Sequence, residues 1–452
     1  MNPRLALGCG ALLLLIAATY LPAMAGPFQF DDHGVIVDNP QVHGLAAWWQ
    51  SMPGIRPLLK LSYALNWTLS PKPLGFHLVN VLVHALNALL VWALATSWLR
   101  DLAPGIARPG LAAGFVALVF ALHPAGTEAV TYVSGRSMSL MALFYLAAMW
   151  LHGQPWRGAA MASALVFALA LGVRETAVTL PVAIWLLAWF AGASTTAILR
   201  GLRWHGLVLV IAALAALALP GYERFLQHSL DTRGLGDQVL GQTQAHQHLF
   251  LHSLAGLRTN LDPDLRVPAG WDVGAGLTVL VMAAAVVLAW RSRRRWPWLG
   301  FGIAWYLLQL APGNSLLPRF DLANDRHLYL ALPGAAFALV VTLFSLRPRW
   351  LAPLALALLV MVLAATSVRR NLDYLDEVAL WTATVAASPG KARAWSNLGW
   401  GRQLQGDLPG AAVAYECALR RDPGHRQALV NLSLLPADLR DQALPEGACN
   451  RP

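Results

Sequence analysis

Two adjacent carboxylates, Asp31 and Asp32, follow the first long apolar run of the chain. At a membrane surface such a pair can supply a general base together with a metal ligand or an orienting group, because like charges in a low dielectric raise one pKa. A solvated acidic turn that caps an amphipathic helix explains the same dipeptide. The pair is therefore a candidate catalytic and metal-binding site that other residues must support.

Further charged residues stand at the ends of later apolar runs. They are His123, Glu128 and Arg136, then Arg174 with Glu175, and finally Asp325 with Arg326, His327 and Tyr329. An arginine at the start of a span suits an anionic group such as a lipid phosphate, which its planar guanidinium can grip. Helix capping, a snorkelling arginine and a structural Arg–Glu pair are the alternative explanations. Charges at the mouths of spans usually mark a site when they converge.

Other polar residues carry weaker predictions. A seam at helical spacing follows one face of the second apolar run: His77, Asn80, His84 and Asn87. Its spacing favours hydrogen-bonded packing over ligand binding. A histidine group lies in the segment 221–271, which we expect to be an outer loop: His246, His248 and His252. The third histidine does not share the strand-like spacing of the first two, which disfavours a metal site.

The elements that would position these residues are membrane spans. The chain has 452 residues, 57% of them hydrophobic and 12% charged, whereas soluble domains are about 25% charged. Runs of about 18 apolar residues cross a bilayer, and we expect an all-α bundle of about 11 such helices. The expected runs are 5–25, 76–99, 111–122, 138–152, 157–172, 177–192, 205–220, 273–290, 297–311, 327–345 and 351–367.

The formal charge of +10 indicates topology, and no basic patch with interleaved aromatics points to nucleic acid. Breaks that carry arginine alternate with breaks rich in Asp, Glu, His and Asn, so the positive-inside rule puts the N-terminus in the cytoplasm and the candidate residues outside. The first run resembles a signal peptide, but its length and the adjoining Asp31 favour an uncleaved span. No cysteine pair has metal-ligand spacing and Cys9 lies in the first run, so neither a zinc site nor a disulfide framework is supported.

The composition becomes that of a soluble domain after Arg370. A small/large alternation typical of tetratricopeptide repeats follows: Trp395, Leu398, Gly399, Ala411, Tyr415, Ala418 and Pro423. We expect a membrane domain at 1–370, with a first outer loop at 26–75, and an outer repeat domain at 371–452. About two repeats are too few for an independent solenoid, so the array should lean on the membrane domain or on a partner.

Taken in order, these motifs resemble the transmembrane and tetratricopeptide-repeat-containing O-mannosyltransferases and their bacterial relatives, which belong to the GT-C class of lipid-linked glycosyltransferases. The segments are FDDHGVIVDNPQV, RPLLKLSYALNW, HLVNVLVHALN, HPAGTEAVTYVSGR, RETAV and NDRHLYLALPG. Family members often carry Lys-Glu at Arg174-Glu175 and Glu-Arg at Asp325-Arg326, which keeps the charge signs. The repeat array is much shorter than in eukaryotic members, which leaves the acceptor open.

The resemblance implies an inverting enzyme that moves a mannose-like hexose from a polyprenyl phosphate to a hydroxyl of a protein or glycan, on the periplasmic face of a bacterial inner membrane. By this analogy a carboxylate of Asp31-Asp32 is the base, with Asp31 preferred. The remaining site residues would bind the donor phosphate and sugar: His123, Glu128, Arg136, Arg174, Glu175, Asp325, Arg326 and, more weakly, Arg56. The resemblance identifies no definite cofactor besides the lipid-linked donor, and a divalent cation at Asp31 and Asp32 stays open.

Two other functions stay open at this point. A ligase or polymerase of lipid-linked oligosaccharides would use a lipid pyrophosphate donor, which the residues do not distinguish. A non-catalytic anchor that displays the repeats to periplasmic partners leaves the charged residues unexplained, and it predicts an intact phenotype after Asp31→Asn with Asp32→Asn. A transporter is disfavoured because the charges gather at one face and not at mid-membrane.

Overall fold

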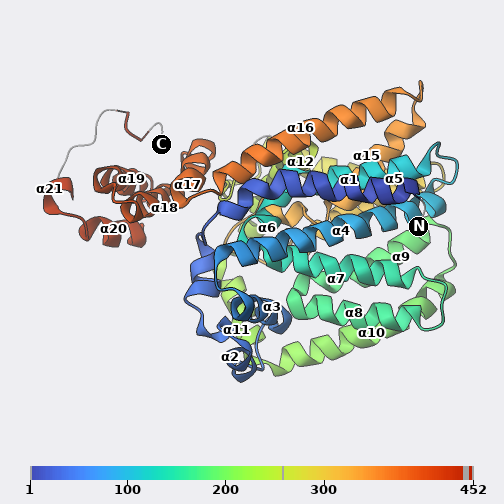
Figure 1. Cartoon of the computed structure of the whole chain (residues 1–452), viewed down its shortest axis with the longest axis horizontal. Coiled ribbons are helices and arrows are strands. Elements are labelled where there is room, and N and C mark those ends of the chain that lie inside the picture. Colours follow the sequence, from blue (N-terminus) through green and yellow to red (C-terminus); the bar gives the residue numbers. More distant parts are fainter. Residues whose placement is uncertain (1–2, 257–258, 441–446, 450–452) are drawn as a thin grey trace.

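The computed structural model of the chain describes residues 3–256, 259–440 and 447–449, and these residues form helices without a β-strand. Long helices run side by side, and the C-terminal helices project from one end of this bundle (Figure 1). The bundle contains α1 (Pro3–Tyr20), α2 (Leu45–Gln50), α3 (Pro57–Leu69), α4 (Pro73–Leu102), α5 (Pro109–Ala121), α6 (Thr127–Val130), α7 (Arg136–His152), α8 (Ala159–Val173), α9 (Leu180–Phe190), α10 (Thr195–Ala218), α11 (Pro220–Thr232), α12 (Leu235–Ala255), α13 (Val273–Ser292), α14 (Pro297–Leu310), α15 (Leu332–Ser345) and α16 (Leu351–Asp373). The projecting part contains α17 (Glu377–Ala387), α18 (Ala392–Leu404), α19 (Leu408–Arg421), α20 (Arg426–Ser433) and α21 (Ala437–Arg440).

Every predicted apolar run forms a helix. By length and composition, five segments among the described residues can cross a membrane: Leu5–Ala25, Pro73–Leu102, Thr195–Ala218, Val273–Ser292 and Leu351–Asp373. The pair Pro109–Ala121 and Pro124–Val130, bent by 53°, adds a sixth if it counts as one span. The other runs form shorter helices, such as α9 with 11 residues, which at 1.5 Å per residue do not reach across a bilayer alone. The total of about 11 spans therefore stays a prediction.

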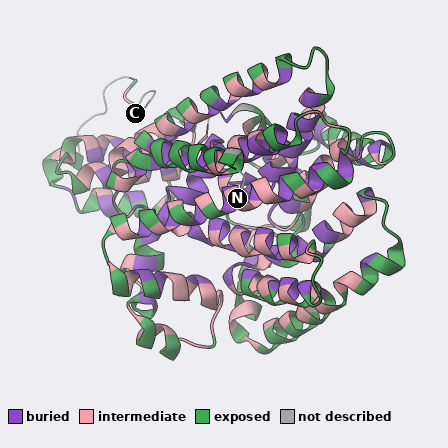
Figure 2. Ribbon diagram, turned by 45° about the vertical axis from the view of Figure 1, so that its right-hand side comes forward, coloured by how far each residue is buried: buried purple, intermediate pink, exposed green. Residues whose placement is uncertain are grey.

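The outer ribbons of the bundle carry long exposed stretches (Figure 2), and many of the exposed residues on α10 and α13 are large and apolar. Leu217 on α10 is 86% exposed, and Val273 at the start of α13 is 88% exposed. Apolar faces of this extent are costly in water but are covered by lipid in a bilayer. Together with the five candidate spans, they identify the chain as a membrane protein.

The segment 221–271, expected as an outer loop, instead contains the helices α11 and α12. The sequence of this segment lacks the hydrophobic pattern of an amphipathic helix, because several of its polar residues are buried against the turn 312–326. The Gln238 side-chain amide donates to the Ser315 carbonyl oxygen at 2.9 Å, and the Asn314 amide donates to Gln242 Oε1 at 3.2 Å. These contacts hold α12 over the turn that carries Asp325 and Arg326.

The polar seam on α4 is buried and hydrogen-bonded, as predicted. His77 Nε2 lies 3.1 Å from the Gly26 carbonyl oxygen, and the His84 ring contacts Tyr329 Oη at 2.7 Å and the Ala121 oxygen at 2.9 Å. Asn80 and Asn87 donate to carbonyl oxygens of Val130 and Ser139. The seam thus ties α4 to the segments that carry the candidate residues. We call that end of the bundle, where 26–44, 123–136 and 312–328 lie, the loop end.

The C-terminal helices pack as small residues against aromatic ones. A Cβ atom on Gly399 of α18 would lie 2.6 Å from Cε1 of Tyr415 on α19, so only glycine permits this approach. Cys417 on α19 forms a disulfide with Cys449. The prediction that no disulfide framework is supported is wrong for this pair, whose Cα atoms lie 5.4 Å apart. Thirty-two residues separate the cysteines, a spacing without a recognisable framework.

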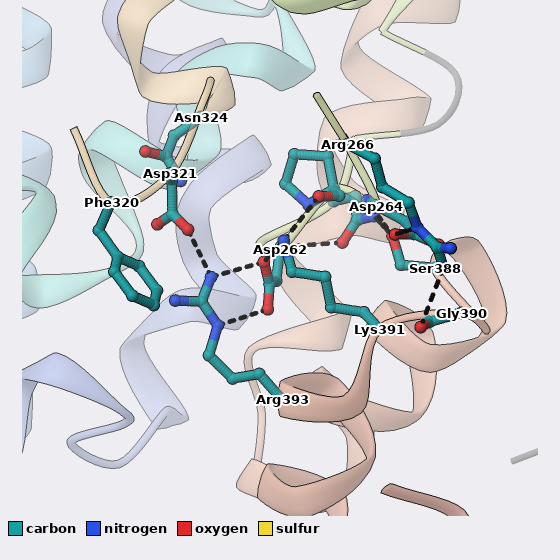
Figure 3. A network of polar contacts seen from close by, with 12 residues as sticks. Asp262, Asp264, Arg266, Phe320, Asp321, Asn324, Ser388, Gly390, Lys391 and Arg393 are labelled. Atoms are coloured by element: carbon teal, nitrogen blue, oxygen red, sulfur yellow. Dashed lines mark hydrogen bonds and ion pairs between the residues drawn. The ribbon is translucent and has the colours of Figure 1, made fainter. Parts of the chain in front are cut away.

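An ion-pair network joins the C-terminal helices to the bundle (Figure 3). Arg393 donates to the Asp262 carboxylate from Nε at 2.6 Å and from Nη2 at 2.5 Å. Nη2 also donates to Asp321 Oδ1 at 2.7 Å. The Lys391 ammonium lies 2.9 Å from Asp262, whose side chain is 2% exposed. Burial by itself raises the pKa of Asp262, but Arg393 and then Lys391 hold it below its ordinary value. The C-terminal helices therefore lean on the bundle, as their small number predicted.

Replacing Arg393 by methionine should lower the free energy that holds the C-terminal helices on the bundle by about 3 kcal/mol, because the buried Asp262 carboxylate loses its main partner. Hydrogen exchange should then show faster exchange in α17 and α18 than in the bundle. The control is Arg420→Met on the exposed side of α19, which should leave exchange unchanged. Equal protection of α17 and α18 in both variants would show that the network does not hold the junction.

Candidate active site at the loop end

Asp32 is buried and anchors the first outer segment, whereas Asp31 beside it is exposed. The backbone N–H groups of Gln29 and Ser134 donate to the two Asp32 carboxylate oxygens at 3.1 and 2.7 Å. The N–H of Asp31 donates to Tyr132 Oη at 2.9 Å. Phe30, directly before the pair, adopts a left-handed backbone conformation with φ of 48°. The dipeptide thus combines an anchor with an accessible carboxylate.

Burial raises the pKa of Asp32 to about 7, although the N–H donors of Gln29 and Ser134 lower it. The negative charge of Asp31 adds to the rise. Asp32 therefore holds a proton at mildly acidic pH, where an unfolded chain has lost it.

The folded state should accordingly lose stability as the pH rises from about 4 to about 7, by up to about 4 kcal/mol from this group. The Asp32→Asn variant cannot titrate there and should show a flatter pH dependence. Thermal unfolding of both proteins in the same detergent between pH 5 and pH 8 measures the difference. Parallel curves would mean that Asp32 titrates alike in the folded and unfolded chains.

Glu128 and Arg326 meet across the loop end. The backbone N–H of Arg326 donates to Glu128 Oε2 at 3.0 Å. In the side chain, Arg326 Nε lies 3.5 Å from Glu128 Oε1 without hydrogen-bond geometry. Burial lowers the pKa of Arg326, but the carboxylates of Glu128 and Asp31 and the phenol of Tyr132 outweigh this and raise it. Asp31 therefore lies within electrostatic range of the Arg326 guanidinium. This juxtaposition joins two elements that are far apart in the sequence.

Three arginines at the loop end have a buried Nε atom without a hydrogen-bond partner among the described residues: Arg174, Arg319 and Arg326. Arg174 donates from Nη1 to Ser137 Oγ at 2.8 Å. Burial lowers its pKa, and the positive charges of neighbouring arginines lower it further. Crowded guanidinium groups with unused donors are suited to an anion that supplies the missing acceptors.

A small cavity separates two of these arginines. It has a volume of about 10 Å³, and its lining includes Arg174, Arg319, Asn314 and His327. That volume is about what one water-sized group needs. Arg319 did not enter the site predicted from the sequence, because it lies several residues before Asp325 in a turn without periodicity.

Two predicted arginines are engaged with other protein groups. Arg56 pairs with Glu175 through two parallel contacts, Nε to Oε1 at 3.0 Å and Nη2 to Oε2 at 2.9 Å. Arg136 is fully buried and donates to the side-chain oxygens of Asn80 at 2.6 Å and Asn66 at 2.7 Å. Its guanidinium also lies 5.0 Å from the ring centre of Tyr63. Arg136 thus clamps α3 and α4 to α7 in this structure.

A large apolar cavity opens beside the same end of the bundle, between α12, α13, α14 and α15. It has a volume of about 630 Å³, and leucine, valine and alanine dominate its lining. His123, His246 and Tyr306 supply polar atoms in its wall. His123 accepts the Ala125 N–H at Nδ1 and therefore donates from Nε2 to the Ser253 oxygen, 3.2 Å away. The cavity has the character of a lipid-chain site with polar groups at one boundary.

Asn314 connects the apolar cavity to the small arginine-lined one. Its carbonyl oxygen lies 2.9 Å from His246 Nε2, and its Oδ1 lies 2.9 Å from His327 Nδ1. His246 lines the large cavity and His327 lines the small one. Asn314 thus links the wall of the apolar cavity to the group of residues around Arg174 and Arg319.

Comparison with known proteins finds relatives that are named protein O-mannosyl-transferase. No family model matches the chain. The chain is 26% identical over 461 residues to protein O-mannosyl-transferase F38B6.6 of Caenorhabditis elegans, across 93% of this chain and 64% of that protein. It is 33% identical over 153 residues to mouse protein O-mannosyl-transferase TMTC3, across 30% of this chain and 16% of that protein.

A third relative, protein O-mannosyl-transferase Tmtc1 of Drosophila melanogaster, is 36% identical over 158 residues, across 31% of this chain and 17% of the relative. The chain thus spans less than two thirds of the C. elegans protein and under a fifth of the other two. Over most of its own length, this membrane protein is similar to proteins named protein O-mannosyl-transferase.

Proposed function

We propose that the protein is a membrane glycosyltransferase that moves a mannose-like hexose from a polyprenyl phosphate to a hydroxyl group of a protein, with inversion at the anomeric carbon. The observation that carries this proposal is the convergence of Arg174, Arg319 and Arg326, with unused buried Nε donors, beside the exposed carboxylate of Asp31. The names of the relatives support the same reaction class.

The donor binds with its phosphate at the arginines and its lipid in the apolar cavity. A phosphate dianion that forms as the sugar leaves gains more from fixed cations than the diester does, so the arginines favour the transition state. The cavity of about 630 Å³ supplies apolar contact for several isoprene units. Asn314 lies between the two cavities. The junction between the lipid chain and the phosphate of the donor would lie near this residue.

Asp31 serves as the general base. The acceptor oxygen forms a bond to the anomeric carbon, the bond from that carbon to the phosphate oxygen breaks, and the hydroxyl proton moves to the Asp31 carboxylate. Asp32 positions Asp31 by fixing the backbone on both sides through Gln29 and Ser134. Glu128 fixes the Arg326 backbone by accepting its N–H, and Glu175 orients the Arg56 guanidinium.

The C-terminal helices belong to this proposal as acceptor-binding tetratricopeptide repeats on the periplasmic side of a bacterial inner membrane. The Gly399–Tyr415 contact has the small-against-aromatic packing of such repeats. Phe30, next to Asp31, lies 5.1 Å from the ring of Trp381 on α17. A protein held by these helices would therefore be delivered close to the proposed base.

The test uses purified full-length protein in lipid nanodiscs with a panel of polyprenyl-phosphate hexoses and a mixture of envelope proteins. Mass spectrometry should detect single hexose additions on serine or threonine with at least one donor. Addition of hexose only from lipid-pyrophosphate oligosaccharides would favour the ligase alternative. No addition from either donor class, with protein that retains its helical content, would contradict the proposal.

A further inference from the structure

Three potential metal ligands come together at the loop end: His248, His252 and Asp325. Asp325 Oδ1 lies 3.2 Å from His248 Nε2 and 2.8 Å from His252 Nδ1. The three ligand atoms all lie within 4.8 Å of one another. Within the described parts of the chain, this is the one group of three His, Cys, Asp or Glu residues with such reach.

Regular structure holds these ligands in place. His248 and His252 are four residues apart on α12, so one helix face presents both rings, whose centres are 3.9 Å apart. The Asp325 carboxylate is oriented by the Asn260 N–H, which donates to Oδ2 at 3.0 Å and leaves Oδ1 toward the imidazoles. A ligand whose second oxygen is fixed by a backbone donor is the arrangement found around protein metal ions.

The donor set selects the kind of ion. Two imidazole nitrogens and one carboxylate oxygen suit Zn²⁺, whereas Mg²⁺ and Ca²⁺ prefer oxygen ligands throughout. Tetrahedral Zn²⁺ with bonds of about 2.1 Å places its ligand atoms roughly 3.4 Å apart. The observed 2.8 and 3.2 Å therefore require outward shifts of a few tenths of an ångström. The imidazole side chains are 12 and 13% exposed, which leaves access for a fourth ligand such as water.

We propose that His248, His252 and Asp325 form a zinc site that fixes the turn carrying Arg326. The site is distinct from Asp31-Asp32, where the two oxygens of Asp32 already accept backbone N–H groups. Asp325 directly precedes Arg326, whose N–H donates to Glu128. An ion bound to Asp325 would thus tie α12 to the proposed donor site. Metal binding itself does not depend on the proposed transferase activity.

Metal content of purified, untagged, full-length protein tests this site. After chelator treatment and buffer exchange, titration with Zn²⁺ should give one tightly bound ion per chain. Bound Co²⁺ should give the visible absorption of a four-coordinate site. His248→Ala and His252→Ala should each weaken Zn²⁺ binding by more than about 100-fold. The control variant is His228→Ala, an exposed histidine on α11, which should bind Zn²⁺ as the unmodified protein does.

Two outcomes would overturn the proposal. One is no tight Zn²⁺ or Co²⁺ binding by the unmodified protein, which would leave a hydrogen-bonded His–Asp–His cluster only. The other is equal Zn²⁺ affinity in His228→Ala and His252→Ala. If the ligand variants fail to fold, X-ray absorption of the zinc-loaded unmodified protein decides. Scattering from two histidines supports the site, and its absence contradicts it.

Discussion

Replacing Asp31 by asparagine should lower hexose transfer by about 100- to 10,000-fold, the usual contribution of a general base. The exposed carboxylate would no longer accept the acceptor proton as the new bond forms. Folding should be unaffected, because the hydrogen bond that ties Asp31 to Tyr132 comes from its backbone N–H and not from its carboxylate. Initial rates with saturating donor, together with size-exclusion profiles, measure both effects.

The matched control is Asp38→Asn, which removes a second exposed carboxylate from the same outer segment. Its activity should stay within about twofold of the unmodified protein, since surface changes of this kind usually have small effects. A similar loss in both variants would point to the net charge of the segment. Full activity of Asp31→Asn would remove Asp31 from the reaction and leave Asp32 as the carboxylate to test.

Replacing Arg174 by glutamine should lower kcat by about 100- to 1,000-fold, as loss of one preorganised donor to a developing anion does in other enzymes. Arg174 is 5% exposed and lies among other guanidinium groups, so its removal also relieves repulsion. The variant should therefore unfold at a temperature no lower than the unmodified protein. Loss of activity with retained stability is the signature of a residue that acts on the substrate.

Arg224→Gln provides the comparison for Arg174→Gln, because Arg224 is exposed on α11. It should keep the kcat of the unmodified protein. The phosphate assignment also predicts that inorganic phosphate or a polyprenyl phosphate raises the thermal stability of the unmodified protein more than that of Arg174→Gln. Equal stabilisation of the two would place the phosphate elsewhere.

Much of the fold follows from the sequence, because long apolar runs have few alternatives to a helix in a membrane. Each such run is a helix in the structure, although several are too short to span by length alone. The helix α12 escaped prediction for the opposite reason: its buried face carries Gln238, Gln242 and Thr243, so no hydrophobic period shows. Gln238 and Gln242 are polar because their side-chain amides donate to carbonyl oxygens of the neighbouring turn.

The missed helix also explains why the sequence pattern disfavoured a metal site at these histidines. With strand-like spacing, His248 pairs with His246 and not with His252, but on a helix His248 and His252 share one face. The sequence did not assign Arg319 to the candidate site, because only the folded turn brings it near Arg174. Conversely, the scarcity of charge made the other residues stand out, and the structure brings Asp31, Glu128 and Arg326 within electrostatic reach. Arg136 fitted the same pattern but is engaged in packing.

The proposed transfer is tested most directly by release of polyprenyl phosphate from a labelled polyprenyl-phosphate hexose, measured with acceptor proteins present. We expect the purified protein to release one lipid phosphate for each hexose transferred, and Asp31→Asn and Arg174→Gln each to suppress both products together. Release that proceeds equally in the unmodified protein and in both variants, or hexose transfer without release of lipid phosphate, would contradict it.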